Sequence, residues 1–87
     1  MFRVIVAPRA RKSSKKMPAH YKERIIEIIE VLGRNPVPSE LYDVTKLSGR
    51  YDTYRIRAGS IRISYVVAWN SNEIHISEIE WRGGAYK

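Results

Sequence analysis

The sequence predicts an α+β fold, in which two N-terminal helices pack on one face of a small, twisted and mainly antiparallel β-sheet. Residues 8–32 carry helical signals, whereas residues 43–82 alternate apolar and polar side chains between turn signals. Runs of helix followed by runs of strand are typical of the α+β class. The chain has 87 residues, 44% of them hydrophobic and 29% charged, which suits one domain over residues 1–87 with one modest core.

The N-terminal part of the chain predicts one strand over residues 2–7, followed by helices over residues 8–16 and 18–32. The second helix has apolar residues at helical spacing, which we expect to face the core: Tyr21, Ile25, Ile28, Ile29 and Leu32. Gly33 stands where a left-handed C-terminal cap is expected, and Pro36 forbids continuation of the helix.

A β-hairpin is predicted over residues 54–65, where apolar and polar residues alternate on both sides of Gly59-Ser60. Glycine followed by serine suits a two-residue loop with glycine at its first central position. This loop predicts the following cross-strand partners: Ala58 with Ile61, Ile56 with Ile63 and Tyr54 with Tyr65.

The other face of this hairpin carries Arg55, Arg57 and Arg62, with Arg57 directly opposite Arg62. A loop at Ala58-Gly59 would change the partners but would keep the three arginines on one face. Like charges across a strand pair destabilise a hairpin, whereas a guanidinium group binds phosphate through two parallel hydrogen bonds. We interpret the arginines as an anion site; the alternative is a solvated sheet face with splayed side chains.

Two further strands are predicted beside the hairpin. Residues 43–47 read as a short edge strand, and residues 74–82 as the last strand, whose alternation changes phase halfway. Either both faces of this strand are partly buried, or a bulge near Ser77-Glu78 turns its apolar residues inward and Arg82 outward. The apolar residues concerned are Ile74, Ile76, Ile79 and Trp81.

The charge balance favours a polyanionic partner, such as nucleic acid, the ribosome or an acidic protein. Lysine and arginine number 16 against 9 acidic residues, which gives a formal net charge of +7. Five basic residues crowd the first predicted helix, with Ala10 as the one apolar residue among them: Arg9, Arg11, Lys12, Lys15 and Lys16. This helix surface either docks on RNA backbone or is a solvated face.

Several kinds of site lack their residues in this sequence. There is no cysteine, and His20 and His75 stand isolated, so we expect no metal site and no cofactor. Glycine-rich phosphate loops and serine-nucleophile motifs are missing. No apolar run reaches membrane-spanning length and no signal-peptide pattern is present, so we expect a cytoplasmic protein without a membrane partner. Arginine and tyrosine remain, and they suit cleavage of RNA by its own 2′-hydroxyl.

Four short motifs, in their order and spacing, resemble the RelE/ParE toxin superfamily, and most of all its RelE-type mRNA interferases. They are KLSG at 46–49, YRIR at 54–57, IRI at 61–63 and WRGGAY at 81–86. The resemblance covers essentially the whole chain and implies a RelE-like, microbial-ribonuclease-like fold. It also implies a toxin that cleaves mRNA in the decoding site of the ribosome and is silenced by a RelB-like antitoxin.

By this resemblance, the expected catalytic residues are Arg55, Arg57, Arg62, Arg82 and Tyr86. The expected nucleic-acid-binding residues are Arg9, Arg11, Lys12, Lys15, Lys16 and Lys46. The implied reaction needs no metal and yields a 2′,3′-cyclic phosphate and a 5′-hydroxyl.

Two departures from the family pattern leave the general base open. Arg55 and Arg57 stand where a well-known bacterial member has lysines, and arginine does not deprotonate at neutral pH. Many members have histidine where this chain has Trp81. Either Tyr86 is the base, because the arginines favour its phenolate, or it stacks on an RNA base while water or the ribosome moves the proton.

Two other functions fit parts of the same pattern. One is a ParE-like toxin of the same fold, which poisons DNA gyrase and cleaves no RNA. The other is a non-enzymatic module that binds RNA or the ribosome. The presence of Arg62, Arg82 and Tyr86 in their expected places favours the endonuclease, because the other two functions do not require that set.

Overall fold

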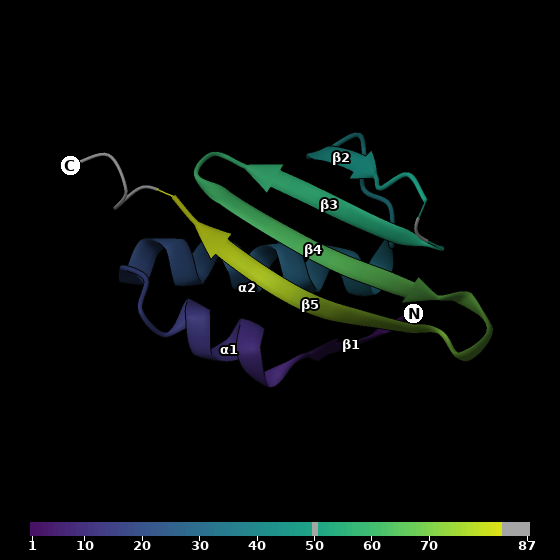
Figure 1. Cartoon of the computed structure of the whole chain (residues 1–87), viewed down its shortest axis with the longest axis horizontal. Coiled ribbons are helices and arrows are strands. Elements are labelled where there is room, and N and C mark those ends of the chain that lie inside the picture. The colour runs from purple at the N-terminus through teal and green to yellow at the C-terminus, as the bar shows by residue number, and fades with distance from the viewer. Residues whose placement is uncertain (50, 83–87) are drawn as a thin grey trace.

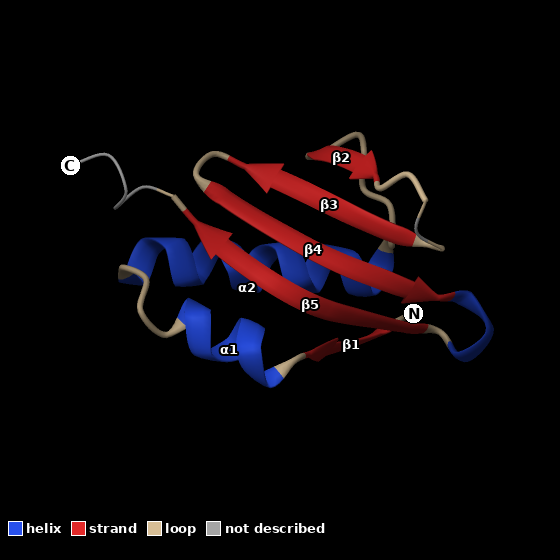
Figure 2. Cartoon of the chain, viewed as in Figure 1, coloured by secondary structure: helices blue, strands red, loops and turns tan. Residues whose placement is uncertain are grey.

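The computed structural model of the chain describes residues 1–49 and 51–82 and confirms the predicted α+β class. Its elements are β1 (Arg3–Val6), α1 (Pro8–Ser14), α2 (Ala19–Arg34), β2 (Asp43–Lys46), β3 (Thr53–Ala58), β4 (Ile61–Ala68), a 3₁₀ turn η1 (Trp69–Ser71) and β5 (Glu73–Trp81). The five strands form one sheet in the order β1-β5-β4-β3-β2. In Figure 1, α2 lies behind this sheet and α1 lies beside β5, beyond the end of β1. Figure 2 shows the same two-layer arrangement by element type.

The N-terminal strand runs parallel to β5, whereas all other strand pairs are antiparallel. The parallel pairing brings Val4 level with Ile74. At the start of β1, the Phe2 N–H donates to the carbonyl of Gly33 at 2.7 Å, and the Arg3 N–H donates to Asn72 at 2.9 Å. The first strand therefore closes the sheet against segments that are distant in the sequence.

The predicted hairpin register is confirmed at each pair. Ala58 lies opposite Ile61, Ile56 opposite Ile63 and Tyr54 opposite Tyr65, all on the buried face. Gly59 adopts a φ of 62°, which is the left-handed region that glycine reaches without strain. The glycine therefore favours the two-residue turn, which places Arg57 opposite Arg62.

A β-bulge causes the change of phase in the apolar and polar alternation of the last strand, which was one of the two predicted explanations. Ser64 pairs with Glu78 and Tyr65 with Ile76, so Ser77 is the additional residue on β5. On both sides of the bulge the isoleucines of β5 are buried, and the half-buried Trp81 packs against the core. A single extra residue thus keeps one apolar face along a nine-residue strand.

The prediction that Gly33 caps α2 in a left-handed conformation is wrong. The helix runs to Arg34, and it ends because Asn35 is extended, with φ −147° and ψ 102°, as the residue before a proline prefers. Gly33 is buried within the last turn, where a β-carbon would lie 3.4 Å from the Phe2 carbonyl oxygen. Its small size serves the close approach of β1 to the helix.

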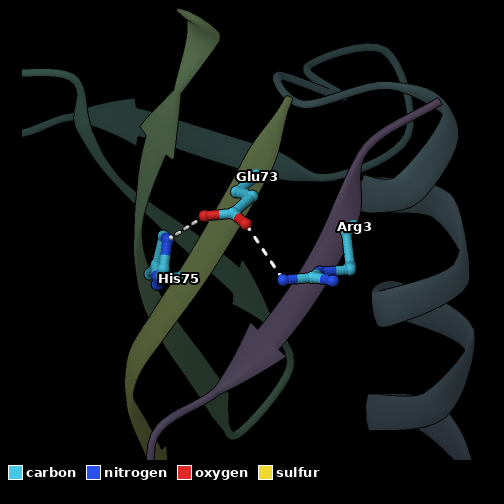
Figure 3. A network of polar contacts seen from close by, with 3 residues as sticks. All are labelled: Arg3, Glu73 and His75. Atoms are coloured by element: carbon cyan, nitrogen blue, oxygen red, sulfur yellow. Dashed lines mark hydrogen bonds and ion pairs between the residues drawn. The ribbon is translucent and has the colours of Figure 1, made fainter. Parts of the chain in front are cut away.

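One core fills the space between the helices and the sheet. The predicted helix stripe is confirmed, with Ile25, Ile28 and Leu32 buried and the other two members half-buried. Among the residues that the structure describes, no helix is long and apolar enough to cross a membrane. Far from the hairpin tip, Glu73 accepts a hydrogen bond from Arg3 at 3.1 Å and contacts His75 at 3.0 Å, which ties β1 to β5 (Figure 3).

Candidate functional site

The sheet face opposite the core, here called the open face, carries the three hairpin arginines. Arg55, Arg57 and Arg62 alternate with buried core residues, so their side chains leave the sheet away from α2. Arg57 lies opposite Arg62, whereas Arg55 lies opposite Ser64. The structure therefore brings together three of the five predicted catalytic residues on two paired strands.

The strand register places an acidic residue on each flank of the arginine pair. Asp43 of β2 lies level with Arg57, and Glu80 of β5 lies level with Arg62, so four charged residues form one cross-strand row. The ion pairs formed between described residues lie elsewhere, at Glu73. None of the four charges in the row is therefore held by an ion pair with another described residue.

Arg55 contributes a donor that the described part of the chain leaves unused. Its Nε is buried and has no hydrogen-bond partner among the described residues. Leaving a buried donor unsatisfied typically costs about 1–3 kcal/mol, so the fold holds this donor at an energetic cost.

Arg82 is fixed at the tip of the hairpin, next to the end of β5. Its backbone N–H donates to the carbonyl of Ser60 at 3.0 Å, and its side chain is exposed. Because this bond continues the β4–β5 ladder, Arg82 stands two residues beyond Glu80 on the same edge of the site. The prediction that the bulge turns Arg82 outward is confirmed.

Trp81 stands on the opposite side of the strand and belongs to the core. Its ring lies 5.3 Å from the ring of Tyr21, and its Nε1 is buried without a well-formed hydrogen bond to a described residue. The Ser60 hydroxyl, and then the Trp81 indole, lower the pKa of the Tyr21 hydroxyl, with a smaller contribution from the charge of Arg24. Trp81 therefore supports the hairpin tip from beneath and does not enter the open face.

A groove of about 860 Å³ runs between α1 and the end of β5 and is called the basic groove here. Its lining residues are Arg9, Lys12, Ser13, Lys16, Met17, Ile79, Glu80, Trp81 and Arg82. The structure thus gathers Arg9, Lys12 and Lys16 beside Arg82, which connects the basic helix with the open face. Lys15 does not line this groove.

A second groove, of about 500 Å³, lies between β1, α1 and α2 and is called the apolar groove. Its walls are mainly aliphatic, and Ile26 is 56% exposed there. Three basic residues border it: Arg3, Arg11 and Lys22. Arg11 therefore belongs to a different surface from the other basic residues of α1.

Lys46 stands apart from this arrangement, as Arg11 and Lys15 do. Lys46 lies at the end of β2 in register with Tyr54, so its side chain leaves the sheet on the helix side. Tyr86 lies outside the described residues. The described residues hold no group of three histidine, aspartate or glutamate side chains placed to bind a metal ion.

Glu80 is the residue of this site that the sequence interpretation did not select. The signal was present, because once the bulge at Ser77 is accepted, Glu78, Glu80 and Arg82 share one face of the last strand. Its register with Arg62, however, depends on strand order, which no local pattern reports.

The comparisons with known proteins agree on one family. No family model matches the chain. The chain is 40% identical over 86 residues to RelE1 of Methanocaldococcus jannaschii, which is named as a toxin, and this match covers 99% of the chain and 96% of that protein. The chain also superposes on a chain of the archaeal RelE–RelB complex from Pyrococcus horikoshii, with a TM-score of 0.85 and 34% identity. This match covers 94% of the present chain and 96% of the other.

A chain of the RelB–RelE antitoxin–toxin complex from Methanococcus jannaschii gives a TM-score of 0.74 at 28% identity, with 94% of each chain covered. The sequence match and the two structural matches extend over nearly the full length of the chain, so the helices, the hairpin and the last strand are all shared. The chain belongs to the RelE family of toxins.

Proposed function

We propose that this toxin is a ribosome-dependent endoribonuclease that cleaves mRNA in the decoding site and so stops translation in the cytoplasm. The observation that carries the proposal is the convergence of Arg55, Arg57, Arg62 and Arg82 at one end of the open face, next to the basic groove. An RNA strand laid along the basic groove would present its phosphates to this cluster. Family membership supports the same activity.

The chemistry requires positioning and charge stabilisation more than a cofactor. The 2′-oxygen of the RNA attacks the adjacent phosphorus, the bond from phosphorus to the 5′-oxygen breaks, and a 2′,3′-cyclic phosphate and a 5′-hydroxyl result. Negative charge grows on the phosphate during this step. Arg62, held on the central hairpin, is the residue we assign to its stabilisation. Arg57 lies level with it on β3, and Arg82 lies two residues beyond Glu80, next to Ser60.

The same proposal includes a RelB-like antitoxin as partner, since similar RelE chains occur in RelE–RelB complexes. The apolar groove supports this assignment, because its aliphatic walls and basic rim suit an amphipathic segment with acidic residues at its edges. Docking there would leave the open face to a second part of the antitoxin.

The direct test is to add the purified toxin to translating ribosomes and to map the new 5′ ends of the mRNA. We expect cuts at codon positions in the decoding site, with 5′-hydroxyl ends, and no cuts in the same mRNA without ribosomes. Intact mRNA together with inhibited DNA gyrase would support a gyrase poison instead. Ribosome binding without cleavage would indicate that the protein is a non-enzymatic binding module.

A further inference from the structure

Glu80 places a carboxylate directly beside the arginine to which we assign charge stabilisation. The residue lies level with Arg62 on the neighbouring strand, and directly opposed residues of an antiparallel pair have β-carbons roughly 4.5–5.5 Å apart on the same face. Glu80 is exposed and lines the basic groove. The cations around it come from α1 (Arg9 and Lys12), from the segment that follows α1 (Lys16), from β4 (Arg62) and from the residue after β5 (Arg82).

Despite these neighbours, Glu80 forms no ion pair with any residue that the structure describes, since the recorded ion pairs involve Glu73. A glutamate whose role was to neutralise Arg62 would be expected to contact it. Glu80 instead lines the basic groove, whose volume is about 860 Å³. An RNA strand that occupied this groove would bring its hydroxyls to the side of this residue.

We propose that Glu80 is the general base of the cleavage reaction, an inference that rests on the proposed function. The Glu80 carboxylate takes the proton from the 2′-hydroxyl as the 2′-oxygen forms its bond to phosphorus. The bond to the 5′-oxygen breaks, and this oxygen takes a proton from water. The protonated Glu80 returns its proton to solvent, so that each turnover begins with the carboxylate.

The other candidate bases among the described residues are poorly placed or chemically unsuitable. Arginine carries its proton at all accessible pH values. Trp81 has no basic nitrogen and packs on Tyr21. His75 is engaged by Glu73 and stands five residues before Glu80 on β5, which corresponds to roughly 16 Å along a strand. Asp43, the other carboxylate of the row, lies level with Arg57 and does not line the basic groove. The carboxylate beside Arg62 is therefore the base that this site offers.

The test compares Glu80→Gln with Glu78→Gln in single-turnover cleavage on ribosomes. Glu78 lies on the same strand and the same face but opposite Ser64, away from the basic groove. We expect Glu80→Gln to slow cleavage by about 100- to 10,000-fold, with ribosome affinity kept or raised, and Glu78→Gln to cleave as the wild type does. Glu80→Asp, which keeps a carboxylate one methylene further back, should recover part of the rate.

A Glu80→Gln variant that cleaves mRNA no more slowly than the wild type would overturn the proposal. If Glu80 only offset the charge of the arginines, Glu80→Gln would bind RNA more tightly and cleave as fast as the wild type, or faster. The dependence of the rate on pH gives a second readout, because the Glu80→Gln variant should lose the part of the wild-type profile that depends on a carboxylate at this position. A wild-type protein that leaves mRNA intact would instead refute the endonuclease itself.

Discussion

Arg57 lies directly opposite Arg62 across the β3–β4 hairpin, so two cations share one rung of a central strand pair. Such a pair opposes folding, because like charges at this spacing repel each other. Asp43 and Glu80 flank the pair in the same row, but neither forms an ion pair with either arginine. The like-charge pair therefore lowers the stability of the fold at the position where the proposed function needs an anion site.

Replacing Arg57 by threonine should separate these two effects. We expect Arg57→Thr to raise the free energy of unfolding by about 0.2–1 kcal/mol, since it removes the like-charge contact, and to lower the rate of mRNA cleavage. Urea unfolding and single-turnover cleavage measure the two quantities. Arg57→Lys is the matched control, because it changes the same side chain but keeps a cation opposite Arg62. A loss of stability in Arg57→Thr would show that the repulsion is negligible.

Removal of the Arg62 guanidinium tests the anion site itself. Losing one preorganised donor of this kind typically costs about 100- to 1000-fold in rate, so Arg62→Ala should cleave slower by about that factor. Ribosome affinity should remain nearly intact, because the basic groove supplies other phosphate contacts. Arg62→Lys should recover only part of the rate, since a point charge does not reproduce a two-pronged contact. Wild-type cleavage by Arg62→Ala would remove the basis of the proposed site.

The local parts of this fold could be predicted from the sequence, whereas the relations between distant segments could not. The alternation around Gly59-Ser60 predicted the hairpin and its register, with a loop at Ala58-Gly59 as the alternative, and the phase change limited the last strand to two explanations, one of them the bulge that is observed at Ser77. The parallel pairing of β1 with β5 left no local pattern, because it joins segments about 70 residues apart. Glu80 was overlooked for the same reason.

Gly33 shows a different limit of sequence-based prediction. A glycine near a helix end is commonly a left-handed cap, but here it lies inside the last turn, where Phe2 approaches the backbone. The basic residues of α1 show a third limit of sequence-based prediction. Their number predicted one charged surface, but the structure divides them between the basic groove and the apolar groove.

This division of the basic residues of α1 leads to a test of RNA binding. A variant in which Arg9, Lys12 and Lys16 are all replaced by alanine should bind the ribosome more weakly. The slope of the logarithm of its binding constant against the logarithm of salt concentration should become shallower by roughly 0.7 for each lost phosphate contact. The control is Arg11→Ala with Lys15→Ala, which removes two cations of the same helix that do not line the basic groove. Equal effects per charge in both variants would mean that net charge, and not the groove, attracts RNA.

The apolar groove leads to a test of the proposed partner. Ile26→Asp places a charge at its exposed aliphatic wall and should weaken antitoxin binding about 10- to 150-fold, the equivalent of losing one buried aliphatic side chain. Cleavage by the free toxin should not change. Leu41→Asp is the matched control, because Leu41 is 65% exposed and does not line this groove. Unchanged antitoxin affinity in Ile26→Asp would exclude the groove as the docking surface.

Tyr65 couples the stability of the core to alkaline pH. The side chain is fully buried, its hydroxyl donates to the Pro36 carbonyl at 2.7 Å, and its ring stacks on Tyr54 at 5.7 Å. Burial, and secondarily Tyr54, raise the pKa of Tyr65 well above its ordinary value of 10.0. The folded protein therefore keeps this proton under conditions in which the unfolded chain releases it.

Because the folded pKa is raised, the stabilising contribution of Tyr65 is fully present below pH 10 and is lost as the pH rises further. While only the unfolded chain ionises at this residue, the free energy of unfolding should fall by about 1.4 kcal/mol per pH unit. Tyr65→Phe should lose about 1 kcal/mol at pH 7, with the hydrogen bond to Pro36, but should show a shallower decline above pH 10. Urea unfolding between pH 7 and pH 11 measures both effects, and Tyr51→Phe, at a tyrosine that is 89% exposed, controls for the removal of a surface phenol. Parallel stability curves for wild type and Tyr65→Phe above pH 10 would contradict the buried, hydrogen-bonded state of the Tyr65 hydroxyl.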